Sequence, residues 1–207
     1  MSRTDTLMMF PFKCSHLKVY MGCMFSGKST SLLNEAQRYR HITDNILMVN
    51  HVFDLKRNND SVSKTGLGQI KTHDNKTSSA LMVNSLGELL TNDFFHSKYE
   101  SADVVIIDEA QFYDDLFLFI SSQLARGDIR KVFIVGGLSG DFQMNHIGQL
   151  YKLLPLADDI VKLNAYCTFC KDGTPASFTK RLCDSNDVIL VGASSEYAPV
   201  CRKHFCM

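Results

Sequence analysis

The chain has 207 residues and 45% of them are apolar, so it is long enough to form one ordinary domain with a sizeable core and a small appendage. Lys plus Arg and Asp plus Glu each number 22, and the resulting formal net charge of zero argues against a nucleic-acid-binding protein, which usually carries a basic excess. No apolar run approaches the ~20 residues of a membrane-spanning helix, and the short apolar run near the start lacks a small-residue cleavage site. We therefore expect no membrane or nucleic-acid partner, a cytoplasmic location and reduced thiols.

The first third of the chain predicts a strand, a turn, a helix and a second strand. Alternating apolar residues indicate a strand at 17–21, and apolar residues at helical spacing indicate a helix at 29–40. A second short apolar run at 45–50 predicts another strand. Residues 54–80 are polar, basic and glycine-containing without a clear period, and we interpret them as a long loop of the kind that is often functional.

The middle of the chain continues the alternation. Residues 80–90 predict a short strand and then a helix, and the continuous apolar run at 102–112 fits a strand buried on both faces of a parallel sheet. A helix is predicted at 116–126, with Gly127 as its C-cap, and another buried strand at 131–138. Strands that alternate with helices predict an α/β fold, a parallel sheet flanked by helices.

The pattern changes after about residue 160, where a polar segment with two cysteines follows and a terminal Cys and His end the chain. We predict three parts: an N-terminal extension at 1–16, an α/β domain at 17–161 and a small second domain at 162–207. A strand-like run at 187–193 belongs to the last part.

One motif fits the pattern G-x-x-x-x-G-K-[ST] without a mismatch, between the first predicted strand and helix. Its glycines let backbone N–H groups turn inward around phosphate oxygens, and the helix that follows adds the positive end of its dipole. The lysine supplies a point charge and the serine hydroxyl can coordinate Mg²⁺. The flanking strand and helix disfavour the alternative, a chance glycine turn. The motif residues are Gly22, Cys23, Met24, Phe25, Ser26, Gly27, Lys28 and Ser29.

Two carboxylates, Asp108 and Glu109, end the buried strand, at the sheet edge where ligands of parallel sheets bind. An isolated Asp-Glu pair would read as a solvated strand end or a helix N-cap. Beside the lysine motif we favour a functional pair, with Asp108 on the metal and Glu109 as the general base. The pair alone does not decide between an ATPase that activates water and a kinase that activates a hydroxyl group.

The seven cysteines lie mostly late in the chain, and two close pairs stand out, Cys167-x-x-Cys170 and Cys201-x-x-His204. Short-spaced Cys and His pairs are the usual layout of a structural tetrahedral Zn²⁺ site. The alternatives are buried or idle thiols with a solvated histidine, or Cys206 as the fourth ligand. The other cysteines, Cys14, Cys23 and Cys183, are most simply packing residues.

These segments together resemble a known family. "MFSGKST", "DEAQF", "GLSGDF", "LLPLAD", "VKLNAYCTFC", "TKRL" and "EYAPVCRKHF" occur in this order. Over about residues 17–205 the chain resembles the type II thymidine kinases. The resemblance implies a RecA-like phosphate-loop sheet, a zinc-held lasso that covers the nucleoside, and ATP- and Mg²⁺-dependent phosphorylation of the thymidine 5′-hydroxyl. It also implies a homotetramer and feedback inhibition by dTTP.

The resemblance also assigns residues. Glu109 matches the general base, Asp108 to Gln111 match the second ATP-contacting stretch, and Asp54 matches an acidic residue on the phosphate side. Where the family usually has an arginine two residues later, this chain has Lys56 with Arg57 adjacent, so either side chain can take that role. The residues that match the nucleoside pocket are Met24, Phe112, Leu138, Phe142, Thr179 and Tyr197, with the lasso segment Val188, Ile189, Leu190, Val191 and Gly192.

Several departures and alternatives stand beside this assignment. Ser139 and Ile147 replace an aspartate and an aromatic residue that the family often has, and His204 stands where animal enzymes have cysteine. Without the family resemblance, we would interpret the aromatic pocket residues Phe112, Phe142 and Tyr197 as core residues. His73 and Asp74 are interpreted as part of a solvated loop. The rival functions are a RecA-like ATPase with a zinc module that binds nucleic acid, and a non-catalytic nucleotide-binding protein.

Overall fold

The structure is a computed structural model that describes residues 14–54, 66–71, 77–183 and 196–207. Its elements as far as the seventh strand are β1 (His16–Gly22), α1 (Lys28–Tyr39), β2 (Ile46–His51), β3 (Leu67–Lys71), β4 (Thr77–Val83), α3 (Glu88–Thr91), α4 (Asp93–Ser101), β5 (Val104–Ile107), η1 (Ala110–Phe112), α5 (Leu116–Ala125), β6 (Val132–Leu138), η2 (Leu150–Leu156) and β7 (Asp159–Leu163). The remaining elements are β8 (Ala165–Tyr166), β9 (Pro175–Ala176), β10 (Phe178–Arg181), β11 (Tyr197–Val200) and α6 (Arg202–Cys206).

Seven strands form one mixed sheet in the order β3-β4-β2-β5-β6-β1-β7. Every neighbouring pair is parallel except β3 and β4, which run antiparallel at one end of the sheet. The predicted α/β class with a mostly parallel sheet is therefore confirmed. The carboxyl ends of the six parallel strands meet at one edge, which is where ligands of such sheets bind.

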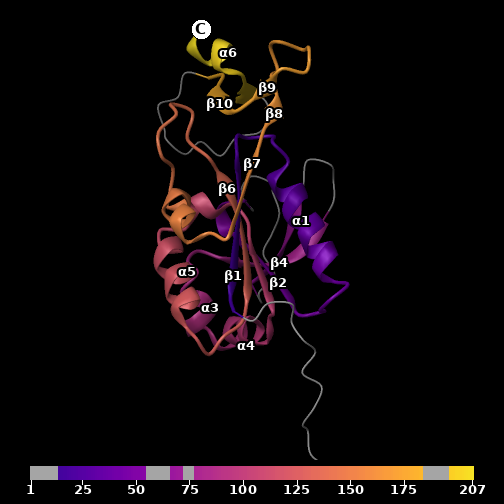
Figure 1. Cartoon of the computed structure of the whole chain (residues 1–207), viewed down its shortest axis with the longest axis vertical. Coiled ribbons are helices and arrows are strands. Elements are labelled where there is room, and N and C mark those ends of the chain that lie inside the picture. The colour runs from indigo at the N-terminus through magenta and orange to yellow at the C-terminus, as the bar shows by residue number, and fades with distance from the viewer. Residues whose placement is uncertain (1–13, 55–65, 72–76, 184–195) are drawn as a thin grey trace, which may run out of the picture.

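Helices cover both faces of the sheet, with α1 on one face and α3, α4 and α5 on the other (Figure 1). The central strand β5 shows why its sequence is continuously apolar. Val105 and Ile107 pack on the side of α5, whereas Val104 and Ile106 pack on the side of α1, and all four side chains are fully buried. A strand buried on both faces needs no polar alternation.

The C-terminal elements lie beyond the carboxyl ends of the strands, at the top of Figure 1. They form two short antiparallel pairs, β8 with β9 and β10 with β11, followed by α6. Their buried core is small and consists of Cys167, Ala176, Ala198, Val200 and Cys201. The proposed boundary at 161/162 falls within β7, which pairs with β1 in the main sheet, and the division into three parts stays a prediction.

Two local expectations are wrong. The segment 54–80 is not one loop, because β3 and the start of β4 pair within it, with Ile70 only 2% exposed. An edge strand with one solvated face carries few apolar residues, so its sequence shows little periodicity. Gly127 does not cap α5 in a left-handed conformation; the helix ends at Ala125, and Arg126 extends away to pair with Asp128.

Among the helices of the described residues, none combines the length and the hydropathy that a membrane-spanning helix needs.

Candidate active site and metal cluster

The predicted phosphate loop, residues 22–29, connects β1 to α1 at the carboxyl edge of the sheet. A Cβ at Gly22 would lie 2.5 Å from both the Leu163 carbonyl oxygen and Ser26 Oγ, and Gly27 has φ 80°, so both positions require glycine. The Lys28 ammonium group donates a hydrogen bond to the Cys23 carbonyl over 2.7 Å, and so lies folded over the loop. The local structure is the strand, glycine turn and helix that the motif requires.

Asp108 follows β5 directly and is only 2% exposed. Burial raises the pKa of its carboxyl and the charge of Glu109 raises it further; the Ser29 hydroxyl, the Glu109 N–H and Lys28 act in the opposite direction, and the resulting pKa is about 7. A nearby cation would favour the ionised form of such a buried carboxylate. Asp108 and the Ser29 hydroxyl are oxygen ligands of the kind that Mg²⁺ prefers, so this pair fits the predicted magnesium site.

Glu109 has a left-handed backbone conformation with φ 50° and ψ 41°, which is uncommon for a residue with a side chain. Its N–H donates to Asp108 Oδ1 over 2.8 Å, and its carboxylate accepts a hydrogen bond from the Gln111 side-chain amide. The side-chain oxygen Oε1 of Gln111 in turn accepts a hydrogen bond from the Leu138 N–H over 3.1 Å. Gln111, predicted to contact ATP, therefore also fixes the Glu109 carboxylate relative to the end of β6. Strained residues of this kind are common at active sites.

Asp54 lies three residues beyond β2 at the same edge and is 9% exposed. Its carboxylate accepts a hydrogen bond of 2.8 Å from the side-chain amide of Asn50, a fully buried residue that the sequence did not single out. Lys56 and Arg57, the two candidates for the family arginine, lie outside the described residues, as do His73 and Asp74.

The predicted nucleoside-pocket residues come from both parts of the chain. Leu138 ends β6, and Phe112 and Phe142 lie in the segments after β5 and β6; all three are half-buried. Thr179 and Tyr197 lie on β10 and β11 and are buried. The lasso residues Val188 to Gly192 lie outside the described residues.

An unpredicted residue, Arg181, lies between two of these aromatic rings. Its guanidinium carbon is 3.7 Å from the centre of the Phe142 ring and 5.2 Å from that of Tyr197, and its Nη2 donates to the Tyr197 hydroxyl over 2.6 Å. The segment "TKRL" contains this arginine, but without spatial neighbours nothing in the sequence separates it from a surface cation. Arg181 joins the loop after β6 to the C-terminal hairpin.

Two further contacts join the predicted phosphate loop to the C-terminal elements. The Cys23 thiol donates to the Ala176 carbonyl over 3.2 Å, and the Met24 N–H donates to the Thr179 hydroxyl over 3.0 Å. Cys23 is buried, as a packing residue should be, but it also bonds a chain segment about 150 residues away. The predicted phosphate loop is thus hydrogen-bonded directly to β9 and to β10, the strand that carries the predicted pocket residue Thr179.

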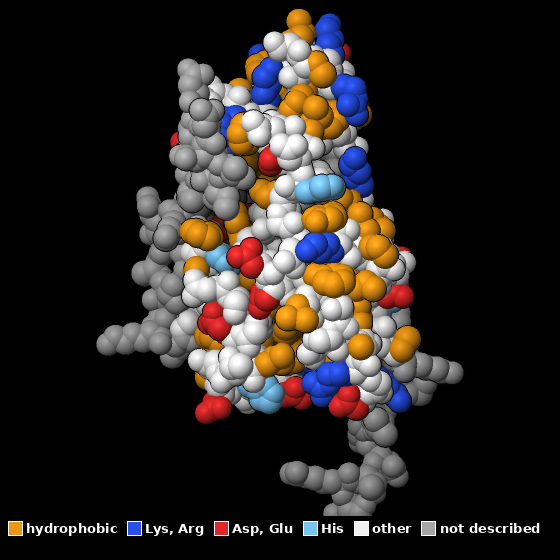
Figure 2. Space-filling model, turned by 90° about the vertical axis from the view of Figure 1, so that its left-hand side faces the viewer, with side chains coloured by type: hydrophobic (Ala, Val, Ile, Leu, Met, Phe, Trp, Pro, Cys, Tyr) orange, Lys and Arg blue, Asp and Glu red, His pale blue; other side chains and the backbone are white. Residues whose placement is uncertain are grey.

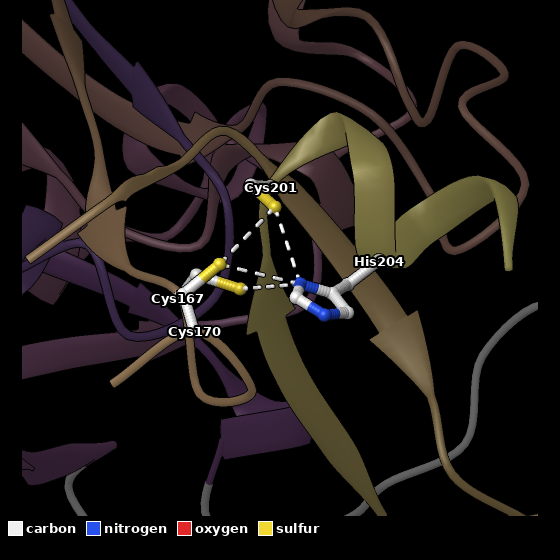
Figure 3. Close-up of side chains that lie close together, drawn as sticks. All are labelled: Cys167, Cys170, Cys201 and His204. Carbon is white, nitrogen blue, oxygen red and sulfur yellow. Dashed lines mark hydrogen bonds between the residues drawn. The ribbon is translucent and has the colours of Figure 1, made fainter. Parts of the chain in front are cut away.

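Cys167, Cys170, Cys201 and His204 converge in the C-terminal part, with all their ligand atoms within 4.8 Å of one another (Figure 3). His204 Nδ1 lies 3.5, 3.3 and 3.4 Å from the sulfur atoms of Cys167, Cys170 and Cys201, and the Cys170 and Cys201 sulfurs are 3.7 Å apart. A tetrahedral Zn²⁺ with usual bond lengths would hold sulfur atoms about 3.8 Å apart and sulfur–nitrogen pairs about 3.6 Å apart. The four donors therefore fit Zn²⁺, with His204 binding through Nδ1.

The surroundings of the cluster act differently on two of its thiols. Burial and the neighbouring Cys167 and Cys201 raise the pKa of the Cys170 thiol to about 11, whereas Cys167 is shifted toward the thiolate. Burial alone would raise the pKa of the Cys167 thiol, but backbone N–H groups near Cys201, Cys170 and Phe169 lower it to about 6. Cys206, the rival fourth ligand, is exposed and lies outside the cluster. Cys14 and Cys183 are also exposed, so the expectation that they pack in the core is wrong.

Comparison with known proteins agrees with this arrangement. A sequence model described as thymidine kinase matches residues 15–205. The thymidine kinase of Rabbit fibroma virus (strain Kasza) is 35% identical over 189 residues, which cover 91% of this chain and 94% of that protein. The thymidine kinase of Fowlpox virus (strain NVSL) is 34% identical over 192 residues, covering 91% and 96%, and that of Oryza sativa subsp. japonica is 33% identical over 190 residues, covering 91% and 65%.

The fold and these matches define an enzyme of the transferase class. Within that class, the chain belongs to the thymidine kinase family, and this membership supports thymidine phosphorylation as its activity.

Proposed function

We propose that the enzyme transfers the γ-phosphoryl group of ATP to the 5′-hydroxyl of thymidine, giving dTMP and ADP. One observation carries the proposal beyond family membership: the turn that holds Asp108 and Glu109 and the loop that holds Lys28 and Ser29 end at the same edge of the sheet. That placement supports a general base and a cationic phosphate site close together at one edge of the sheet, which an in-line phosphoryl transfer requires.

Each residue has a separate role in the proposed reaction. Glu109, oriented by Gln111, accepts the proton of the 5′-hydroxyl as that oxygen attacks the γ-phosphorus. Lys28, with Lys56 or Arg57, offsets the charge that develops on the equatorial phosphate oxygens. Asp108 and Ser29 would hold Mg²⁺, which when bound neutralises charge on the phosphates.

The C-terminal part, residues 162–207, is the proposed nucleoside lid. Met24, Phe112, Phe142, Thr179 and Tyr197 supply its pocket walls, together with Leu138 and the lasso residues 188–192. A lid of this kind matters because water in the site would be phosphorylated in place of thymidine, and ATP would be lost. Zn²⁺ held by the Cys/His cluster would order the short hairpins, whose own apolar core is small.

The proposal includes a homotetramer in the cytoplasm that dTTP inhibits, without a nucleic-acid partner. Figure 2 shows hydrophobic side chains on the face made by α5 and η2, where Phe117, Leu118, Tyr151 and Leu156 are 38 to 71% exposed. Exposed apolar patches of this kind mark interaction sites in many proteins and are compatible with assembly. Light scattering of the purified protein measures the number of chains directly, and inhibition by dTTP is measured in the kinase assay.

The chief rival function is an ATPase with a zinc module that binds nucleic acid. The two functions differ in what stimulates ADP release. We expect ADP release to require thymidine and to be unaffected by single-stranded or duplex DNA. ADP release that rises with DNA and ignores thymidine would reject the kinase proposal.

A further inference from the structure

His51, the last residue of β2, lies among three aromatic rings and is 4% exposed. Its imidazole stacks on Phe53 with ring centres 4.9 Å apart and an interplanar angle of 19°. It also contacts Phe112, at 5.5 Å, and the edge of Tyr113, at 4.9 Å. Phe53 precedes Asp54, and Phe112 follows Glu109 by three residues. The ring of His51 thus fills the space between the two chain segments that carry these carboxylates.

The hydrogen bonds of His51 select one protonation state. The Phe53 N–H donates to Nδ1 over 3.1 Å, so Nδ1 must carry a lone pair rather than a proton. Nε2 lies 3.2 Å from the Asn84 carbonyl oxygen, which can only accept, so Nε2 must carry the proton. Together the two partners require the neutral Nε2–H tautomer.

We propose that neutral His51 is a positioning residue, which holds the Asp54 segment and the Glu109–Phe112 turn in their catalytic relation. The proposal deepens the proposed kinase function and rests on it. In this role His51 acts through its contacts with the Phe53 backbone and the Phe112 ring. Because a small displacement of a positioned group can cost a large factor in rate, loss of these contacts should lower turnover in a protein that still folds.

The proposal predicts a dependence on acid. The titratable groups around the ring are the carboxylates of Glu88 on α3 and of Glu109 and Asp114 on either side of η1, with the Tyr113 hydroxyl beside them. Burial lowers the pKa of His51 below its ordinary value despite the Asn84 bond and these carboxylates. Protonation would place a second donor against the Phe53 N–H. The positioning effect is therefore present above the pKa of His51 and lost as the pH falls through it.

Two substitutions separate the ring contacts from the hydrogen bonds. His51→Phe keeps a ring but leaves the Phe53 N–H without an acceptor. His51→Asn keeps an acceptor oxygen near the Nδ1 position and cannot titrate in this range. His96→Phe is the matched control, because His96 lies on α4 with its side chain 47% exposed.

The measurement is kcat and KM for thymidine at saturating ATP, from about pH 8 to about pH 5.5, well below the unfolding temperature of each variant. At the upper pH, His51→Phe should lower kcat/KM about tenfold, chiefly through kcat, because the Phe53 N–H loses its acceptor. His51→Asn keeps that acceptor but loses the ring contact with Phe112, so its kcat/KM should fall by less than that of His51→Phe, while His96→Phe should stay within about threefold of the parent. As the pH falls, the ratio of parent to His51→Asn activity should fall as well. Parental kcat/KM in both His51 variants at the upper pH would overturn the proposal.

Nitrogen NMR of the imidazole tests the same proposal without catalysis. We expect an unprotonated Nδ1 at neutral pH in the parent protein, and an Nδ1–H tautomer or an imidazolium would overturn the positioning role. If the parent protein does not phosphorylate thymidine, the proposed function fails, and the NMR result still decides whether His51 makes the two hydrogen bonds on which its positioning role depends.

Discussion

Glu109 carries the proposed chemistry, and its surroundings fix its side chain before any substrate arrives. Its backbone is in the left-handed conformation, and its carboxylate accepts a hydrogen bond from Gln111. The sequence located this carboxylate, because Asp108 and Glu109 end a continuous apolar run. Neither the backbone conformation nor the hydrogen bonds of Gln111 to Glu109 and Leu138 could be predicted from the sequence, because both arise from the turn that η1 makes beside β6.

Replacing this base should abolish turnover while leaving the fold intact. We expect Glu109→Gln to lower kcat by about 10²–10⁴-fold with a small change in the KM for thymidine, because the amide cannot accept the hydroxyl proton. Asp114→Asn, which removes an exposed carboxylate five residues away, is the control and should keep near-parental kcat. Steady-state kinetics decide the matter, and near-parental turnover by Glu109→Gln would reject the assignment.

Glu35 makes a second residue-level prediction, about stability and pH. It is 6% exposed, and its Oε1 accepts hydrogen bonds from Lys18, Tyr20 and Arg38 over 3.0, 2.7 and 3.0 Å, which joins α1 to β1. Burial alone would raise the pKa of its carboxyl, but the bonds from Tyr20 and Lys18 hold the pKa below the ordinary value. The stabilisation is therefore complete above the unfolded pKa of about 4.3 and disappears as the pH falls through the lower folded pKa.

We expect Glu35→Gln to reduce the free energy of unfolding by about 1–3 kcal/mol at neutral pH, because three donors lose an ionised acceptor. Urea unfolding at a series of pH values measures this, and the difference should shrink below about pH 4. Glu100→Gln, at a side chain that is 44% exposed, should cost much less. A difference for Glu35→Gln that persists unchanged in acid would contradict the pKa argument.

At the scale of elements, the contacts between the predicted phosphate loop and β10 should couple the two halves of the site. Thr179→Val keeps the side-chain shape but leaves the Met24 N–H without its acceptor. An unsatisfied buried donor of this kind costs about 1–3 kcal/mol of free energy. We expect the KM for thymidine to rise about tenfold, more than kcat falls. Thr168→Val, at an exposed threonine in the same part of the chain, is the control. An unchanged KM for thymidine in Thr179→Val would show that this contact does not shape the pocket.

Sequence patterns predicted the central elements better than the peripheral ones. The strands β1, β2, β5 and β6 were predicted because strands in the middle of the sheet are rich in apolar residues. The edge strand β3 was missed because one of its faces meets solvent, and α4 was missed because its segment "DFFHSKYES" buries only Phe95 and Tyr99. Contacts between residues far apart in the chain could not be predicted from the sequence. The Cys23–Ala176 hydrogen bond and the position of Arg181 between two rings arise only from tertiary packing.

At the scale of the whole molecule, the Cys/His cluster was the long-range feature that spacing predicted most directly, since two short pairs 30 residues apart define it. We expect the purified protein to contain one zinc ion per chain by metal analysis. Cys170→Ser should lose the metal and expose the C-terminal hairpins to proteolysis, because metal binding orders them. Cys206→Ser is the control, since that thiol lies outside the cluster, and should keep full occupancy. Carefully purified protein without zinc would reject the assignment.

The central claim is that the γ-phosphoryl group of ATP is transferred to a nucleoside rather than to water. The most direct test incubates the protein with ATP radiolabelled in its γ-phosphate and with each of the four deoxynucleosides in turn, and follows the label by chromatography. We predict labelled dTMP, formed in a one-to-one ratio with ADP and strongly dependent on thymidine. Label that is released only as inorganic phosphate, whichever nucleoside is present, would contradict the account.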